Sequence, residues 1–197
     1  MNSFLFVPFI SVLVLPTASL EGRILPKTTS AAWPAILTFF NAILLYFPWG
    51  IAIISGRHMK IGPLAVLGFF MIAVGLFLLA TALPLILRVP GQMRSIPERL
   101  VVEGPYRWIR HPIYLSHFLV IGGSALASGA FKVFLETPVL LGIAAIAAKY
   151  EESRRLLPLF EKTFEQYKGK SNFLLPTWGW VVLGLIYSLV ALCVFLS

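Results

Sequence analysis

Residues 61–87 have the sequence IGPLAVLGFFMIAVGLFLLATALPLIL, which contains no charged side chain. A helix needs about 20 apolar residues to cross the roughly 30 Å hydrocarbon core of a bilayer, so this stretch predicts a membrane-spanning helix. Uncharged stretches of similar length occupy residues 2–20, 28–56 and 171–197. Of the 197 residues, 58% are hydrophobic and 12% are charged, which is far from the composition of a water-soluble domain. We therefore expect a multi-pass integral membrane protein.

Two further spans are predicted between Pro112 and Tyr150. The apolar sequence there is interrupted by a turn-forming segment at residues 128–130 and by Lys132 and Glu136. Continuously apolar segments favour helices over the alternating strands of a membrane barrel. The sequence thus predicts an all-α, polytopic bundle of about six transmembrane helices.

The distribution of Lys and Arg predicts the orientation of this bundle. Residues 88–111 contain five basic residues and residues 149–176 contain six. With six spans and an external N-terminus, these eleven basic residues lie inside together with two more in residues 21–30. That makes thirteen basic residues inside and three outside, as the positive-inside rule requires. Cleavage of residues 1–20 as a secretory signal would reverse this asymmetry, and a basic n-region is missing there. Both basic segments are therefore expected on the cytosolic side.

Two groups of residues predict packing and anchoring. Trp33, Trp49, Trp178 and Trp180 fall near predicted span ends, where indole rings sit well at headgroup depth. Small residues follow one another within the fourth span, where they let helices approach closely; they are Gly122, Gly123, Ser124, Ala127, Ser128 and Gly129.

Several classes of function are disfavoured. The net charge of +8 falls in loops between spans, where orientation and anionic lipid explain it better than nucleic acid does. The three His and Cys193 have no metal-ligand spacing, so no metal is predicted. The chain lacks a G-x-G-x-x-G motif and a Walker loop, which argues against a soluble dinucleotide-binding domain.

The segment from Glu103 to Tyr114, EGPYRWIRHPIY, gathers two Tyr, two Arg and one His directly before an apolar span. Pro112 suits the first turn of a helix, where its missing N–H is not needed. Arg110 and His111 would then stand at the membrane surface beside the free backbone donors of that turn. From the residues alone, an ordinary basic and aromatic interfacial cap explains the segment equally well.

A second cluster, KYEESRR at residues 149–155, follows the fifth predicted span. Helical salt bridges between Arg155 and either Glu151 or Glu152 could account for it, but carboxylates at a membrane exit are costly unless they are paired or used. The next segment is amphipathic and is expected to lie in the interface; its apolar side carries Leu156, Leu157, Phe160, Phe164 and Tyr167.

Taken in order, Gly104-Pro-Tyr-x-x-x-Arg-His-Pro-x-Tyr114, the Glu151-Glu152 pair about forty residues on, Phe160, Tyr167 and Pro176 resemble a known family. It is the isoprenylcysteine carboxyl methyltransferase family, with its membrane relatives that methylate phospholipids. The resemblance covers residues 97–176. It implies a cytosolic pocket for S-adenosyl-L-methionine and a lipophilic methyl acceptor, either a prenylated cysteine or a phospholipid.

The same resemblance implies roles for individual residues. Contacts to the cofactor are expected from Leu100, Val101, Tyr106, His111, Pro112, Ile113, Tyr114 and Glu152. Arg110 and Glu152 are the expected catalytic residues, with Arg110 orienting an acceptor carboxylate. Lys149 and His117 are the candidate contacts to the substrate. The activity expected first is protein-S-isoprenylcysteine carboxyl O-methyltransferase-like.

This chain departs from the family pattern at two places. The family usually has Gly and then Tyr after the position of Phe160, whereas this chain has Glu161 and Phe164. The basic residue that precedes the glutamate pair in animal enzymes aligns with Ala148, and Lys149 is its neighbour. These departures concern the identity of the acceptor more than the type of reaction.

Two other functions are weighed against methyl transfer. An NADPH-dependent sterol-type reductase has a similar R-H-P-x-Y stretch, but it tends to have an Arg- and Asp-rich segment where this chain has Glu151-Glu152. A transporter or scaffold would predict ionisable residues in the middle of the spans, or inverted repeats, but apart from Glu136 and His117 the predicted spans carry no ionisable residue. The expected organisation is N-terminal helices over 1–88, a catalytic region over 89–176 and a last helix over 177–197, in the endoplasmic reticulum membrane of a eukaryote or the cytoplasmic membrane of a prokaryote.

Overall fold

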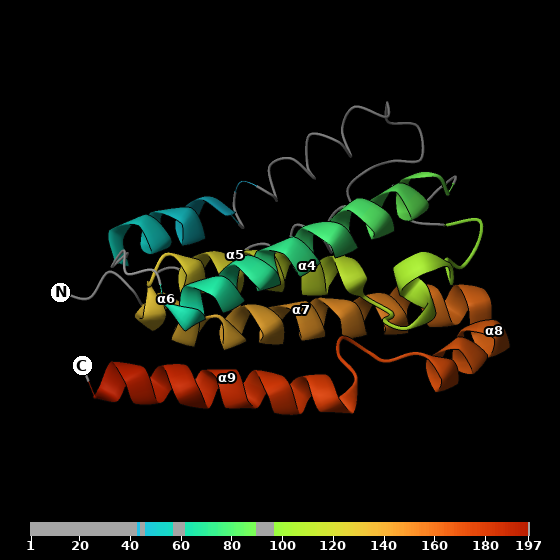
Figure 1. The fold of residues 1–197 in the computed structure, drawn as a ribbon. Helices are drawn as coiled ribbons and strands as arrows, with labels where there is room; N and C mark the ends of the chain where they lie inside the picture. Colours follow the sequence, from blue (N-terminus) through green and yellow to red (C-terminus); the bar gives the residue numbers. More distant parts are fainter. Residues whose placement is uncertain (1–42, 44–45, 57–61, 90–96, 197) are drawn as a thin grey trace.

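The computed structural model describes residue 43 and residues 46–56, 62–89 and 97–196. Within these ranges the chain forms helices and no strand, apart from an isolated bridge between Ile109 and Asn172. After a helix over residues 46–56, the elements in order are α4 (Pro63–Leu87), the 3-10 turn η2 (Gly104–Arg107), α5 (Pro112–Ala127), α6 (Phe131–Glu136), α7 (Pro138–Glu151), the π-turn η3 (Glu152–Leu156), α8 (Leu157–Lys170) and α9 (Thr177–Phe195) (Figure 1). The all-α class is confirmed for this part of the chain.

Three helical segments of the described part are long and apolar enough to cross a membrane. They are α4, the run Phe131–Lys170 that contains α6 to α8, and α9. The apolar helix α5 is shorter, with 16 residues. The protein is therefore an integral membrane protein. The predicted span over residues 2–20 and much of the one over 28–56 lie outside the described residues, so the total of six spans remains a prediction.

Helices α4 and α5 run antiparallel and meet through glycines, as the small residues of α5 predict. A Cβ atom at Gly68 would lie 2.4 Å from the backbone nitrogen of Ala127, and one at Gly123 would lie 2.7 Å from the carbonyl oxygen of Gly68. Further along the same contact, a Cβ at Gly75 would lie 3.0 Å from the carbonyl oxygen of Ser116. Only glycine leaves room for the two backbones to touch. This contact fixes the position of α5, which begins at the residues that carry the polar cluster.

The chain turns back after α5, so that α7 returns beside it. Gly129 has φ 74°, a conformation that suits glycine, and α6 and α7 follow at once (Figure 1). As a result Pro112 at the start of α5 and Glu151 at the end of α7 lie at one end of the bundle. This end, with η2, η3 and α8, is called the polar end below.

The hydrophobic core differs from the sequence expectation at one tryptophan. Trp49 is fully buried among α5, α6 and α7 residues of the core and is not an interfacial anchor. Trp178 and Trp180, in contrast, are 71% and 43% exposed in the first turn of α9. In the middle of α9, Tyr187 stacks on Phe134 with ring centroids 4.6 Å apart and shares a 2.5 Å hydrogen bond with Thr137. The other predicted anchor, Trp33, lies outside the described residues. A tryptophan near a span end is thus buried when a neighbouring helix covers it.

Candidate functional site

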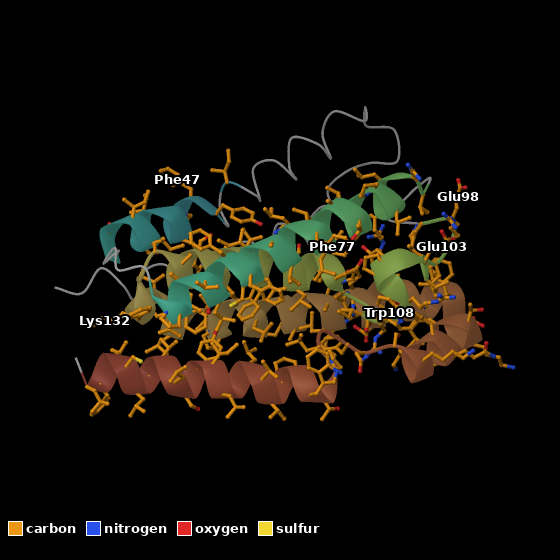
Figure 2. All side chains as sticks on the ribbon, in the orientation of Figure 1. Phe47, Phe77, Glu98, Glu103, Trp108 and Lys132 are labelled. Atoms are coloured by element: carbon orange, nitrogen blue, oxygen red, sulfur yellow. The ribbon has the colours of Figure 1, made fainter. Side chains whose placement is uncertain are left out.

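Among the described residues, most charged side chains lie at one end of an apolar bundle. Figure 2 shows nitrogen and oxygen atoms concentrated where Glu98, Glu103 and Trp108 are labelled, and carbon along the membrane helices that separate this end from Lys132. Ionisable groups are expensive within the hydrocarbon layer. Their concentration at the polar end marks it as the place where this protein can carry out chemistry.

A buried ionic network joins α5 to η3. Oε1 of Glu152 accepts a hydrogen bond from Arg110 Nε at 2.8 Å and lies 3.0 Å from His111 Nε2. His111 is 5% exposed and Glu152 is 7% exposed. Charged groups so far from water are retained where they are paired and fully hydrogen-bonded. The meeting of His111 and Glu152, 41 residues apart, confirms the antiparallel arrangement expected of the fourth and fifth spans.

Arg110 also fixes the segment that follows α8. Its Nη1 donates to the carbonyl oxygens of Ser171, at 2.5 Å, and Lys168, at 3.2 Å. The backbone nitrogen of Arg110 donates to the carbonyl oxygen of Asn172 at 2.8 Å. The guanidinium therefore acts as a structural tie between three elements.

A hydrogen bond of Tyr167 connects α8 to η2. Its hydroxyl donates to the carbonyl oxygen of Tyr106 at 2.6 Å, and Phe164, one turn earlier, is also buried. Glu161, between these residues and η3, has φ 40° and ψ −116° and kinks α8. The resemblance places a glycine at this position, and such a backbone conformation costs other residues about 1–3 kcal/mol. Beyond the kink, Phe164 and Tyr167 are the buried residues of α8.

A cavity of about 200 Å³ opens beside this network. Its wall comes from α4, the segment before η2, η2, α5, α7, η3 and α8. Of the residues predicted from the sequence, it includes Leu100, Val101, Tyr106, Arg110, His111, Ile113 and Tyr114. Five further lining residues had no predicted contact to the cofactor: Ile86, Arg99, Glu151, Leu156 and Tyr167. Tyr167 and Glu151 belong to the motifs quoted above, while nothing in the sequence marks Ile86 or Arg99.

Two of the expected cofactor contacts, Pro112 and Glu152, help to build the polar end but do not line the cavity. Pro112 is the first residue of α5 and sets where that helix begins. Glu152 holds Arg110 and His111 in place. The carboxylate in the cavity wall is instead that of Glu151, whose Oε2 accepts a 3.4 Å hydrogen bond from the Tyr114 hydroxyl and lies 3.8 Å from His111 Nδ1. The two adjacent glutamates therefore have different surroundings.

The aromatic residues of the cavity keep their hydroxyl protons at neutral pH. Burial raises the pKa of Tyr106 well above its usual range, and the negative charge of Glu151 and the neighbouring Tyr167 add to the shift. Tyr106 and Tyr114 thus present neutral rings to the cavity, and the Tyr114 hydroxyl donates to Glu151. Ring faces of this kind attract cations.

The two candidate substrate contacts lie outside the cavity wall. His117, on α5, shares a 2.5 Å hydrogen bond between its Nδ1 and the hydroxyl of Tyr46. Its ring also makes an edge contact with the Tyr46 ring. Lys149, at the end of α7, lies with Nζ 5.2 Å from the ring centroid of Phe173. The sequence offered no reason to single out Phe173, which also contacts Arg110 and His111.

A comparison with protein families adds an independent finding. The model of the phospholipid methyltransferase family matches residues 63–163, which is just over half of the chain. The matched region begins with α4 and ends within α8, so it contains the Arg110–His111–Glu152 network but not Ser171 or Phe173. Comparisons with curated proteins and with solved structures return no match.

Proposed function

The chain belongs to the phospholipid methyltransferase family, and from that premise we propose that it transfers a methyl group from S-adenosyl-L-methionine to a lipid acceptor at the polar end. Membership of this family supports a membrane methyltransferase that acts on lipid. The observation that carries the proposal is the composition of the cavity wall, in which a carboxylate and two tyrosine rings face one space.

The residues of the cavity suit a cationic methyl donor. S-adenosyl-L-methionine supplies a methyl group already activated by a sulfonium, so the protein has to position the reactants and exclude water more than it has to move protons. Tyr106 and Tyr114 offer ring faces to such a cation. Leu100, Val101 and Ile113 supply the apolar surface that keeps water out. His111, held by Glu152, completes this wall.

The charges of the cavity favour an amine acceptor over a carboxylate. Arg110, the expected partner of an acceptor carboxylate, has Nε on Glu152 and Nη1 on two backbone carbonyls. The other lining cation, Arg99, pairs with Glu103 at 2.8 Å. A lipid amine has to lose a proton to be methylated, and the Glu151 carboxylate lies in the cavity wall with 3.8 Å contacts to Arg155 Nη1 and His111 Nδ1. We therefore place a phospholipid amine before a prenylated cysteine as the acceptor.

Ligand binding tests the proposal against an NADPH-dependent reductase. Detergent-purified protein is expected to be stabilised by S-adenosylhomocysteine and unaffected by NADPH in a thermal-shift measurement. A ligand at a hundred times its dissociation constant stabilises the folded state by about 2.7 kcal/mol. Stabilisation by NADPH alone would show that the cavity serves a reductase. Formation of a methylated lipid from radiolabelled donor and phosphatidylethanolamine then identifies the reaction.

The cytosolic position of the polar end is tested by labelling. Cys193 is exposed, so it is first replaced by Ser. Ser153 is exposed in η3, at the polar end, and Lys132 is exposed at the other end of the bundle (Figure 2). In sealed inside-out vesicles an impermeant maleimide is expected to label Ser153→Cys and not Lys132→Cys, because the basic segments face the cytosol. Labelling of Lys132→Cys alone would reverse the orientation.

A further inference from the structure

The ring of Phe173 contacts three cationic or ionisable side chains beside the cavity. Its ring makes an edge contact with His111 at 5.4 Å between centroids and an interplanar angle of 74°. Arg110 Cζ lies 5.6 Å and Lys149 Nζ lies 5.2 Å from the same ring centroid. Phe173 and Lys149 do not line the cavity, whereas Arg110 and His111 do. The surface around Phe173 is thus a neighbour of the cavity, joined to it through Arg110 and His111.

Lys149 is the cation of this group that has no acidic partner. Arg110 is paired with Glu152, and Glu151 has its contacts with Tyr114, His111 and Arg155. Among the described residues, Lys149 forms no ion pair within 4.0 Å, and its side chain is exposed. A ring face holds the ammonium group without neutralising it. The Lys149 charge therefore remains available to an external anion.

The depth of Lys149 in the membrane indicates which anion it meets. It belongs to the last turn of α7, where that helix leaves the bundle. Phe173 precedes α9 by four residues, and the first turn of α9 carries the exposed Trp178 and Trp180. Exposed indole rings in such a position mark the level of the lipid headgroups. Phospholipid phosphates lie at that level, and basic side chains attract them there.

We propose that Lys149, held over the Phe173 ring, is a subsite for the phosphate of the phospholipid acceptor. The inference rests on the proposed function and deepens it. A phosphate bound at Lys149 lies beside Arg110 and His111, which contact the same Phe173 ring and line the cavity. The subsite selects lipids that carry an anionic phosphodiester next to the group to be methylated. A neutral lipid amine would lack this contact.

The kinetic test compares two acceptors in detergent micelles: phosphatidylethanolamine and a long-chain primary amine without phosphate. Lys149→Gln is expected to raise KM for the phospholipid about tenfold, the factor that corresponds to loss of one charge-assisted contact, and to leave kcat unchanged. KM for the phosphate-free amine should stay as in the wild type, and Lys149→Arg should restore binding of the phospholipid. Lys162→Gln, an exposed charge on α8 with no ion pair among the described residues, is the matched control.

A binding measurement separates failure of the subsite from failure of the proposed function. At one fixed concentration, dihexanoyl phosphatidylethanolamine is expected to raise the Tm of the wild type and of Lys162→Gln equally and that of Lys149→Gln clearly less, while dihexanoylglycerol, which lacks the phosphate, raises none. If the wild type binds the phospholipid through Lys149 but methylates no lipid, the subsite stands and the proposed function falls. If the wild type methylates the phospholipid and Lys149→Gln has the same KM and the same thermal response, the subsite is wrong. A response of the wild type to inorganic phosphate equal to that of the lipid would show a general anion site and overturn the assignment to the acceptor.

Discussion

Glu152→Gln is expected to lower the free energy of unfolding by about 3–5 kcal/mol, the range for breaking a buried ion pair by removing one partner. The carboxylate oxygen Oε1 accepts from Arg110 and faces His111. A Gln amide keeps the size of the side chain but removes the charge that balances the Arg110 guanidinium, whose side chain is 11% exposed. The measurement is denaturant unfolding in detergent, with and without S-adenosylhomocysteine.

The same substitution is expected to weaken donor binding by about 1–3 kcal/mol, the penalty for leaving a buried polar group unpaired. The reason is indirect, because Glu152 holds two residues of the cavity wall. Glu165→Gln is the control, since Glu165 is exposed on α8 and pairs with Lys168 at the surface, where a pair contributes at most about 1 kcal/mol. Equal effects of the two substitutions on stability and on donor binding would mean that the Arg110–His111–Glu152 network does not support the site.

Gly123→Ala is expected to destabilise the protein by about 1–3 kcal/mol, the range for overpacking a close contact. The added Cβ would lie 2.7 Å from the carbonyl oxygen of Gly68 and 2.9 Å from the backbone nitrogen of Ile72. Both neighbours are backbone atoms, so α4 and α5 have to move apart to admit it. Because α5 begins at the polar end, we also expect a loss of donor affinity, measured by titration with S-adenosylhomocysteine.

Gly142→Ala is the matched control for this substitution. Gly142 lies within α7 and a Cβ there would meet nothing within 4 Å. Because Ala is the better helix former, this change should leave stability unchanged or raise it by up to about 1 kcal/mol. If the two alanine variants unfold at the same denaturant concentration, the close packing of α4 on α5 is not what stabilises the bundle.

The position of Glu151 and Glu152 shows where sequence reasoning reached its limit. Successive residues of an α-helix point about 100° apart. Glu151 and Glu152 therefore face different neighbours, Glu151 the cavity and Glu152 the side chains of Arg110 and His111. The π-turn η3 begins at Glu152 and widens the helix at that point, which changes the direction of the residues that follow. The resemblance implies a contact of Glu152 to the cofactor, which stays a prediction, and Glu151 is the one of the two glutamates that lies in the cavity wall.

By itself, the sequence determined the membrane helices, the turn between α5 and α7, and the gathering of the motif residues at one end, because these depend on apolar length, on turn-forming residues and on the order of the chain. The tertiary structure alone decided that Trp49 is buried, that Arg110 is bonded to Glu152 and to the carbonyls of Ser171 and Lys168, and that Phe173 joins Lys149 to the site. The contacts of Arg110 join residues 42 to 61 positions apart, and those of Trp49 and Phe173 arise between different elements of the fold. They follow from how helices pack and where a wide turn redirects the chain, and local sequence patterns carry no record of either.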